Sequence, residues 1–377
     1  MCDKSLEKTV EALKKFNFEG DIIRVVPFGS GIINDTFLVV CNDKDGNKNQ
    51  YIIQKINNLI FKNINQLMEN YCNICDYLKA VISKRGGDVD RQTITVVPTK
   101  KGKNFYCDSM GNCWRSIKFI KNTVTYDVSE SPQDFYKVGR TFGKFQNMLS
   151  DYNAAKLYET IPNFHNTKER YKSFIKSVEI DKVNRLDNVI NEVNFIIERK
   201  EDTSILLDLL EKGELPLRVT HNDTKISNIL MDATTKEGIC VIDLDTIMPG
   251  LSLYDFGDAI RSGATHVLED EKDLNKVFID LEFFEAFTKG FLEETANSLT
   301  EKEIELLPMS VKVITLEQGM RFLTDYLNGD VYYKTSYNNQ NLDRTRTQLK
   351  LVKDIEEKLD EMKNIVNKSL SNNIVEG

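Results

Sequence analysis

The chain has 377 residues, 41% of them hydrophobic and 29% charged, with a formal net charge of -8. This composition is typical of a globular protein long enough for two domains or one two-lobed domain. The negative balance argues against non-specific nucleic-acid binding, which needs a positive surface, although a locally positive pocket for a small anion remains compatible with it. No apolar run approaches the roughly 18 residues that a membrane-spanning helix needs, so we expect no membrane partner.

The seven cysteines are an odd and scattered set. Cys72 and Cys75 form a CxxC pair, but no second pair or histidine cluster completes a zinc site, so we interpret both as packing thiols of a helix. The charged, amphipathic start of the chain, MCDKSLEKTVEALKKF, is not typical of a signal peptide. We therefore expect a cytoplasmic protein in a reducing compartment.

The next hundred residues alternate like strands around one amphipathic helix. Apolar residues recur at helical spacing over residues 64–83, and the Asp-Gly turn at 45–46 is a strong hairpin signal. The expected strands cover Asp21–Pro27, Asp35–Cys41, Gln50–Ile56, residues 92–98 and residues 113–120. This order predicts a small lobe with a five-stranded antiparallel sheet plus a helix.

From residue 122 onward the apolar spacing is mainly helical. We place the boundary near residue 121, which gives an N-terminal nucleotide-binding lobe, 1–121, and a C-terminal catalytic lobe, 122–377. The one strand-like region of the second lobe surrounds the sequence VTHNDTKISNIL, Val219–Leu230. A polar loop between apolar runs is usually a working surface. The fold class predicted is therefore α+β, with a small sheet-containing lobe and a large helical one.

The loop VTHNDTKISNIL contains a pattern of oxygen ligands. Asp223 and Asn228 are five residues apart, and Asp243 follows at the end of the apolar run GICVI. This layout is typical of phosphoryl-transfer enzymes of the kinase type, in which Asp223 would accept the proton of the attacking hydroxyl while Asn228 and Asp243 hold Mg²⁺. A polar turn with an asparagine cap is the alternative for either fragment alone, and the combination favours the kinase.

A second motif, Asp-Phe-Gly at residues 255–257, matches the metal-binding triplet of protein kinases. It lies 27 residues after Asn228, and Asp243 already ends the strand where the metal ligand belongs. We therefore expect the sequence SLYDFGDAIR to begin a helix, with Asp255 near its N-terminus. In this interpretation Asp255 anchors the catalytic loop by hydrogen bonds and binds no metal.

The small lobe supplies candidates for binding the nucleotide phosphates. The turn Gly29-Ser30-Gly31 lies between the first two strands, where backbone N–H groups can approach a phosphate. On the third strand Lys55 is the candidate cation, with Glu69 of the following helix as its partner. Gln54 and Lys55 point to opposite faces of the strand, so only one of them can face the nucleotide.

Several sequence motifs carry a resemblance to a known family. The sequence THNDTKISNIL followed by VIDLDT resembles the HxDxxxxN and DxD motifs of the aminoglycoside phosphotransferase and choline kinase superfamily. The longer strings GSGIINDTF, YIIQKIN, VIDLDTIMPGLSLYDFGDAIRSGA and RFLTDYLNGDVYYK are similar to bacterial N-acetylhexosamine 1-kinases. The resemblance spans nearly the whole chain.

The resemblance implies a bilobed protein-kinase-like fold and ATP- and Mg²⁺-dependent phosphorylation of the anomeric hydroxyl of N-acetylglucosamine or N-acetylgalactosamine. By motif position Asp223 would be the catalytic base, Asn228 and Asp243 metal ligands, and Asp245 a further ligand. The third strand departs from the pattern, because Gln54 stands where a lysine is expected. The partners implied are ATP and a small-molecule sugar.

A sugar site needs hydrogen-bonding groups and an aromatic face. The candidates for sugar binding are Asn34, Asp35, Thr36, Arg115, Arg321, Asp325 and Tyr326. Arg321 and Asp325 are four apart, so a salt bridge along a helix is an equal alternative for them. Trp114, the only tryptophan, alternates along a strand, and we expect it to pack inside the small lobe.

Two other functions remain open. The first is a kinase of the same fold with another small hydroxyl acceptor, such as homoserine, choline or an aminoglycoside. The second is a pseudokinase that holds nucleotide without turnover, which the intact set of Asp223, Asn228 and Asp243 disfavours. A protein kinase is the least favoured, because no activation loop or APE segment lies between Asp243 and Pro249.

Overall fold

The structure is a computed structural model that describes residues 11–29 and 34–375. The chain divides into two compact units. The first comprises Met1–Val124 together with Met231–Asp245, and the second comprises Thr125–Leu230 and Thr246–Gly377. Within the described ranges, no helix combines the length and the apolar character needed to cross a membrane.

The first unit is built on an antiparallel sheet of six strands in the order β1-β2-β3-β6-β4, with β5 paired to β6. Its strands are β1 (Asp21–Pro27), β2 (Asp35–Asn42), β3 (Lys48–Ile56), β4 (Val96–Val97), β5 (Tyr106–Cys107) and β6 (Cys113–Lys118). The prediction of five strands was wrong by one, because β5 is only two residues long and has no alternating pattern of its own. The strand predicted over 92–98 is shorter than expected, since α3 (Val89–Gln92) occupies its start.

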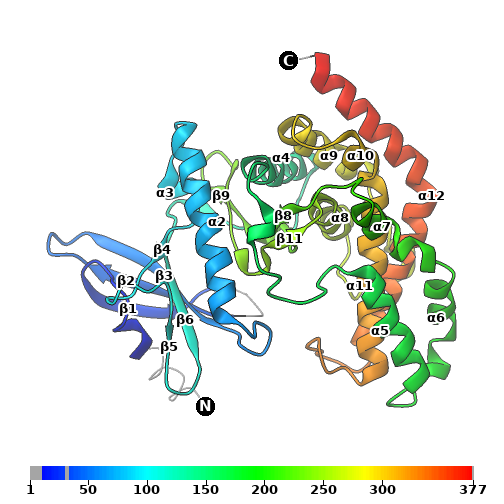
Figure 1. The fold of residues 1–377 in the computed structure, drawn as a ribbon, viewed down its shortest axis with the longest axis horizontal. Helices are drawn as coiled ribbons and strands as arrows, with labels where there is room; N and C mark the ends of the chain where they lie inside the picture. Colours follow the sequence, from blue (N-terminus) through cyan, green and yellow to red (C-terminus); the bar gives the residue numbers. More distant parts are fainter. Residues whose placement is uncertain (1–10, 30–33, 376–377) are drawn as a thin grey trace. The chain divides into compact units, whose positions relative to one another are not determined.

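The β2–β3 hairpin forms at the Asp-Gly turn that the sequence indicates. Gly46 has a φ of +82°, and the carboxylate of Asp43 accepts the backbone N–H groups of Asp45 and Asn47. Helix α2 (Ile64–Lys84) follows the third strand, begins at the Asn63 cap and lies against one face of the sheet (Figure 1). The apolar residues of α2 recur at helical spacing, so they form one side of the helix, and this side is buried.

The opposite face of the sheet packs on the segment before β1. Trp114 is 2% exposed there, in a cluster with Leu13, Phe16, Tyr51 and other apolar residues. The prediction that Trp114 packs inside the small lobe is confirmed. This face of the sheet is therefore filled by a hydrophobic core and leaves the α2 face for polar chemistry.

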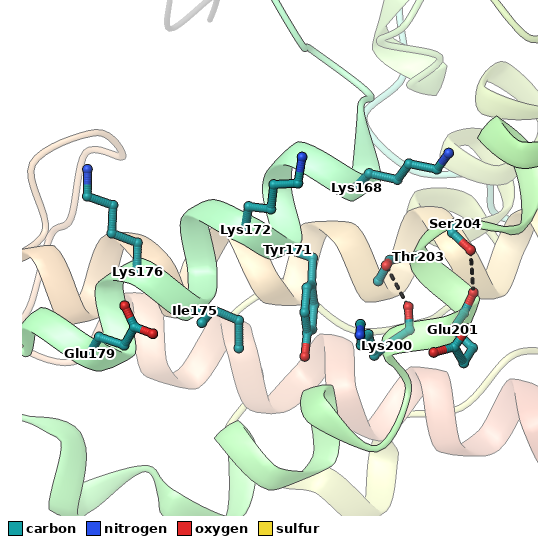
Figure 2. A pocket seen from close by; sticks show the side chains of 10 residues that line it. All are labelled: Lys168, Tyr171, Lys172, Ile175, Lys176, Glu179, Lys200, Glu201, Thr203 and Ser204. Atoms are coloured by element: carbon teal, nitrogen blue, oxygen red, sulfur yellow. Dashed lines mark hydrogen bonds between the residues drawn. The ribbon is translucent and has the colours of Figure 1, made fainter. Parts of the chain in front are cut away.

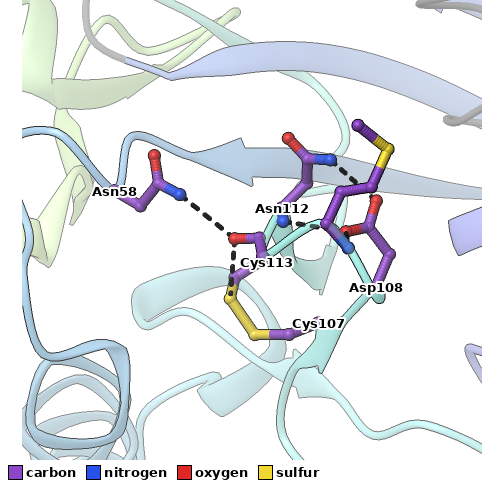
Figure 3. The surroundings of a disulfide bond; sticks show 7 residues. Asn58, Cys107, Asp108, Asn112 and Cys113 are labelled. Atoms are coloured by element: carbon purple, nitrogen blue, oxygen red, sulfur yellow. Dashed lines mark hydrogen bonds between the residues drawn. A yellow bond between two sulfur atoms is a disulfide. The ribbon is translucent and has the colours of Figure 1, made fainter.

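The β5–β6 hairpin contains a disulfide bond between Cys107 and Cys113 (Figure 3). Asp108 closes the turn by accepting the backbone N–H groups of Met110 and Asn112, and Asn58 donates to the carbonyl of Gly111. This bond was not predicted from the sequence, where the reducing compartment that we expect gave no reason to pair cysteines. No pairing signal is visible in the sequence, because Cys107 and Cys113 are simply two members of an odd, scattered set, six positions apart.

The other cysteine pair behaves as expected from packing. Cys75 is fully buried in α2, and burial raises the pKa of Cys72 to about 11. Such thiols carry little thiolate at neutral pH and are poor metal ligands. Within the described residues, no cluster of three or more His, Cys, Asp or Glu side chains could hold a metal ion.

A second, three-stranded sheet of order β10-β9-β7 joins β7 (Thr123–Val124) to the hairpin of β9 (Ile229–Asp232) and β10 (Gly238–Val241). Thr123 pairs with Asp232, whose carboxylate also binds Arg91 at 3.0 Å. These contacts place residues 231–245 in the first unit, whereas the sequence boundary at 121 assigns them to the second lobe. Strand pairing over about a hundred residues leaves no local trace in a sequence.

The second unit is mainly helical, with one two-stranded sheet. Its helices of five or more residues are α4 (Pro132–Met148), α5 (Thr167–Ile180), α6 (Ile190–Ile197), α7 (Ile205–Glu211), α8 (Ser252–Gly263), α9 (Leu281–Thr295), α10 (Glu301–Glu305), α11 (Leu307–Asn328) and α12 (Gln340–Val375). The sheet pairs β8 (Arg218–Thr220) with β11 (Met248–Gly250). Helices α8, α11 and α12 lie together in Figure 1 and form the body on which the polar loop after β8 rests.

The Asp-Phe-Gly triplet lies in the first half of α8, which agrees with the prediction that this sequence begins a helix. Phe256 is fully buried among Phe284, Phe287 and Phe291 of α9. A Cβ atom at Gly257 would lie 2.7 Å from the carbonyl oxygen of Ser310, so glycine lets α8 approach α11 closely. Two residues of the triplet therefore serve helix packing, and the third, Asp255, faces the loop.

Candidate functional site

The loop of residues 221–224 is held by two carboxylates of α8. Asp255 accepts hydrogen bonds from the backbone N–H groups of His221 (3.0 Å) and Asn222 (2.8 Å), and Asp258 accepts one from Thr224 (3.0 Å). The two aspartates are three positions apart in the sequence, so they lie on one face of the helix. The prediction that Asp255 anchors the loop by hydrogen bonds is confirmed. Burial raises the pKa of Asp255, although the His221 and Asn222 hydrogen bonds oppose that rise.

The same loop brings Asp223 and Asn228 together. The side-chain amide of Asn228 donates to the backbone carbonyl of Asp223 at 2.8 Å and to its Oδ2 at 3.1 Å. These bonds fix the amide with its nitrogen toward Asp223, which leaves Oδ1 of Asn228 as an oxygen donor for a cation. The two residues singled out by their spacing are therefore neighbours in space, in the second unit.

Lys225 is a member of this group that the sequence reasoning missed. Its Nζ lies 2.9 Å from Oδ1 of Asp223, and the charge of Asp223 raises the pKa of the lysine well above its usual range. Lys225 is half-exposed, so its ammonium remains accessible to an anion. The sequence did contain a signal for this contact, because Lys225 lies only two positions after Asp223 in the same short loop.

Asp243 and Asp245 belong to the first unit and have different environments. Asp243 has a φ of +59°, a left-handed conformation that costs free energy in a non-glycine residue and is often kept where function requires it. Asp245 is 3% exposed, and both of its oxygens are taken: Oδ1 by Arg115 and Oδ2 by Asn34 at 2.6 Å. Both oxygens of Asp245 are therefore engaged within the first unit, which argues against Asp245 as a cation ligand, and the role of Asp243 as a ligand stays a prediction.

The predicted substrate residue Arg115 instead lies inside the first unit. It is 1% exposed, its guanidinium is 4.3 Å from the ring centre of Tyr71 on α2, and its Nε donates to Gln54 at 2.9 Å. Burial alone would lower the pKa of Arg115, but the charge of Asp245 keeps it above the usual value. This network fixes β3, β6 and the segment of Asp245 to one another, and it leaves Arg115 without a surface for a sugar.

The register of β3 settles which of its two residues faces this network. Gln54 pairs with Arg115, while Lys55 pairs with Trp114 on the opposite face of the sheet. Lys55 therefore lies on the face of the sheet opposite to the one that α2, the helix of Glu69, covers. The alternation along β3 therefore favours Gln54 over Lys55 as the residue that faces α2, and the predicted pairing of Lys55 with Glu69 stays a prediction.

The remaining small-lobe candidates lie near β1 and β2. Gly29 has a φ of +76°, which suits a turn that exposes backbone N–H groups, while Ser30 and Gly31 lie outside the described residues. Both ends of the Asn34 side chain are used, because its oxygen accepts from Asn57 N at 3.0 Å. Thr36 accepts a bond from Gln54, and Asp35 is exposed.

The structure separates the three candidates of α11. The carboxylate of Asp325 accepts the backbone N–H groups of Val331, Tyr332 and Tyr333 and so closes the chain reversal after the helix. Tyr326 is 3% exposed in the hydrophobic core of the second unit. These contacts give Asp325 and Tyr326 structural roles and leave neither open to a ligand.

Arg321 has a different environment, beside polar groups of the same helix. It donates to Gln318 and lies 3.9 Å from Glu317. The alternative of an Arg321–Asp325 salt bridge was wrong, since Glu317 is its acidic neighbour and Asp325 is engaged by the backbone. Of the three α11 candidates, Arg321 is therefore the one whose N–H groups remain available to a ligand.

A separate groove of about 630 Å³ lies between α5 and η3 (Lys200–Thr203) in the second unit (Figure 2). Its lining residues include Lys172, Lys176 and Lys200 around Tyr171 and Ile175. None of the residues predicted for catalysis or substrate binding lines it. The chemistry of the loop is therefore to be sought at α8 and not in this groove.

Comparison with solved structures defines the fold class. Three of the similar structures are a microcompartment-associated aminopropanol kinase, the amicoumacin kinase hAmiN in complex with AMP-PNP and Ca²⁺, and the choline kinase LicA from Streptococcus pneumoniae. Their sequence identities to this chain are 15%, 14% and 13%, and their TM-scores are 0.57, 0.56 and 0.54. The alignments cover 95%, 94% and 94% of this chain and 98%, 94% and 99% of those chains, respectively. The chain has the fold of the aminoglycoside phosphotransferase and choline kinase structures.

A family model matches the middle part of the chain. Residues 101–281 match the phosphotransferase enzyme family, APH. The matched stretch contains Asp223, Asn228 and Asp243 and also the anchoring residue Asp255. The segment that carries the polar loop is therefore similar to this family, in agreement with the motifs in the sequence.

Proposed function

We propose that the protein is a kinase that transfers the γ-phosphoryl group of ATP to a hydroxyl group of a small molecule. The observation that carries the proposal is the loop of Asp223, Lys225 and Asn228, held in one shape by Asp255 and Asp258. Positioned groups of this kind supply most of the catalysis in phosphoryl transfer, because little covalent chemistry is left to the protein.

In this proposal each polar residue of the loop has one task. Asp223 accepts the proton of the acceptor hydroxyl as its oxygen bonds to the γ-phosphorus, and the bond to the β-phosphate bridging oxygen breaks to release ADP. Lys225 places a positive charge beside Asp223, where it can also meet a phosphate oxygen. The anchors on α8 keep these groups from relaxing when substrates leave.

Mg²⁺ is the cation that the oxygen donors would hold. Within the second unit Asn228 offers its Oδ1, and by motif position Asp243 is the second candidate ligand; hard oxygen donors of this type suit Mg²⁺. A bound Mg²⁺ would neutralise charge on the nucleotide phosphates. The likeness to a structure that contains AMP-PNP and Ca²⁺ supports a divalent cation with ATP. A cytoplasmic location, where ATP is plentiful, is part of the same proposal.

We further propose that the acceptor is an N-acetylhexosamine, phosphorylated at its anomeric hydroxyl. The support is the resemblance of long sequence strings to N-acetylhexosamine 1-kinases. An anomeric hydroxyl is more acidic than an ordinary alcohol, so a carboxylate such as Asp223 suffices as its base. An amino-alcohol acceptor is the second candidate, because the aminopropanol kinase and the choline kinase share the fold.

The test is product identification. The protein is incubated with Mg²⁺-ATP and a panel of N-acetylglucosamine, N-acetylgalactosamine, choline, 1-amino-2-propanol, homoserine and an aminoglycoside, and the products are assigned by phosphorus NMR. Phosphate at C1 of an N-acetylhexosamine supports the full proposal. Phosphate on an amine-bearing acceptor retains the kinase and removes the sugar, whereas bound ATP without transfer to any acceptor leaves a pseudokinase.

A further inference from the structure

A buried pair of ionisable side chains lies outside the residues used so far. Nδ1 of His165 is 3.0 Å from Oε1 of Glu317 on α11, and the two residues are 9% and 1% exposed. The second polar atom of each side chain, Nε2 of His165 and Oε2 of Glu317, is also buried and has no hydrogen-bond partner in the described part of the chain. Buried polar atoms without partners are rare in folded proteins and call for an explanation.

The pair lies beside the catalytic loop within the second unit. The ring of His165 packs against the ring of Tyr254 on α8, with 5.1 Å between the ring centres. The next residue of α8 is Asp255, which binds the backbone of His221 and Asn222. Two consecutive residues of α8, Tyr254 and Asp255, therefore connect the pair to the loop that carries Asp223.

The charges around the pair favour a neutral ligand. Arg321 lies 3.9 Å from the partnered oxygen of Glu317, and Arg170 donates to the carbonyl of Phe164 without an acidic side chain at ion-pair distance in the described residues. Burial, and then the charge of Arg321, lower the pKa of Arg170. The guanidinium groups of Arg321 and Arg170 both act on the carboxylate of Glu317, and the other carboxylate that acts on His165, Asp258, is paired with Arg261. An added ammonium group would therefore be repelled on balance.

The hydrogen-bonding pattern of the pair further limits which functional groups a ligand would need. A carboxylate oxygen of Glu317 can only accept from Nδ1, so in the tautomer that carries its proton on Nδ1 the Nε2 atom is left as an acceptor next to the free oxygen of the carboxylate. Both atoms then require donors, which hydroxyl groups supply. Aromatic faces stand nearby, since the guanidinium of Arg321 lies 5.3 Å from the ring centre of Phe164 and 5.9 Å from that of Tyr333. Sugars combine hydroxyl donors with an apolar ring face.

We propose that Nε2 of His165 and Oε2 of Glu317 bind two hydroxyl groups of a neutral, polyhydroxylated acceptor beside the catalytic loop. The inference rests on the proposed kinase function and goes beyond it. It assigns acceptor recognition to a pair that no sequence motif indicated, and it excludes acceptors whose ammonium group would lie at this pair.

The test uses three variants of the full chain and one control. Glu317→Gln replaces an acceptor oxygen by an N–H donor, and His165→Asn keeps a group near Nδ1 while removing the acceptor at Nε2. His165→Gln restores an amide near the Nε2 position. His266→Asn is the control, because His266 also forms a His–carboxylate pair, with Asp280 at 2.8 Å, but this pair is exposed.

Each protein is assayed on whichever panel member the wild type phosphorylates, with acceptor and ATP varied separately. We expect Glu317→Gln and His165→Asn to raise the acceptor KM by about tenfold to a hundredfold, as loss of a hydrogen bond to a charged or buried group predicts. The KM for ATP should stay within about twofold. We expect His165→Gln to recover part of the loss and His266→Asn to match the wild type.

The outcomes separate this inference from the proposed function. Unchanged acceptor KM in Glu317→Gln and His165→Asn, with the wild type active, overturns the inference and leaves the kinase. Equal losses for acceptor and ATP, with a lower melting temperature, indicate a structural pair and also overturn it. If the wild type prefers an ammonium-bearing acceptor, the proposal of a neutral ligand at this pair is wrong. If the wild type neither binds nor phosphorylates any member of the panel, both this inference and the proposed kinase function are wrong.

Discussion

Arg115 and Asp245, 130 residues apart in the chain, form a buried ion pair inside the first unit. Removing one partner leaves a buried charge without compensation. We expect Arg115→Met and Asp245→Asn each to lower the free energy of unfolding by about 3–5 kcal/mol, measured by urea denaturation. The double variant should be more stable than the sum of the single losses implies, because no unpaired charge remains. Single variants as stable as the wild type would show that the pair is not formed.

The opposite orientations of Gln54 and Lys55 give a second prediction. Gln54 donates to Thr36 and accepts from Arg115, whereas Lys55 shares the face of Trp114. We expect Lys55→Ala to leave the KM for ATP within about twofold of the wild type, and Gln54→Ala to raise it several-fold by loosening Arg115. Steady-state kinetics at varied ATP provide the measurement. A large effect of Lys55→Ala alone would reverse the assignment of faces.

The elements that the sequence predicted well are those with a strong local signal. The bounds of β1 match the prediction, and those of β2, β3 and α2 differ by at most two residues, because an Asp-Gly turn and regular apolar spacing mark them. The loop of Asp223 and Asn228 was also found locally, since five residues of chain are enough to bring the two side chains together.

The features that were not predicted depend on contacts between segments that are far apart in the sequence. The pairing of Arg115 with Asp245 and the register that turns Lys55 away from α2 are set by strand neighbours, and no spacing reports them. His165 had no motif around it, so its pairing with Glu317 over 152 residues could not be predicted. Asp325 was misassigned because a polar residue near a helix end suits both a ligand and a backbone cap.

The anchoring of the loop by Asp255 predicts a defect in turnover without a defect in binding. Asp255→Ala removes the acceptor for the N–H groups of His221 and Asn222, so Asp223 loses its fixed position. We expect kcat to fall by about a hundredfold while Mg²⁺-ATP still binds with near-normal affinity by calorimetry. Loss of metal binding with an intact loop would instead support Asp255 as a ligand.

The proposed base gives the most direct test of the chemistry. Asp223→Asn keeps the size of the side chain and the bond from Asn228, but it cannot take up the proton of the acceptor. We expect kcat to fall by about 10² to 10⁴-fold with ATP affinity retained. Lys225→Met should show a smaller loss, since the lysine positions charge without moving the proton. Near-normal turnover of Asp223→Asn would remove Asp223 from the role of base.

Glu303 predicts how stability depends on pH. Its buried carboxylate accepts hydrogen bonds from Arg218 of β8, from Ser252 of α8 and from the backbone of Thr300, so it ties together the two elements that flank the loop. Burial alone would raise the pKa of Glu303, but the Arg218 side chain and these hydrogen bonds hold it below its usual value. A depressed pKa means that the folded state binds the proton less readily than the unfolded state does. The stabilisation is therefore complete above the unfolded pKa of about 4.3 and is lost as the pH falls through the lower folded pKa.

The measurement compares Glu303→Gln with the wild type by urea denaturation between pH 7 and pH 3. At pH 7 we expect the variant to be less stable by about 1–3 kcal/mol, because a charged acceptor of several hydrogen bonds has been replaced by a neutral amide. The difference should shrink as the pH falls below about 4, where the wild-type carboxylate itself becomes protonated. Glu305→Gln is the matched control on the same helix, since its side chain is 66% exposed and contacts Lys302 alone among the cations within ion-pair distance in the described residues. A difference between Glu303→Gln and the wild type that stays constant over this pH range would mean that the carboxylate is not held in its charged form by Arg218.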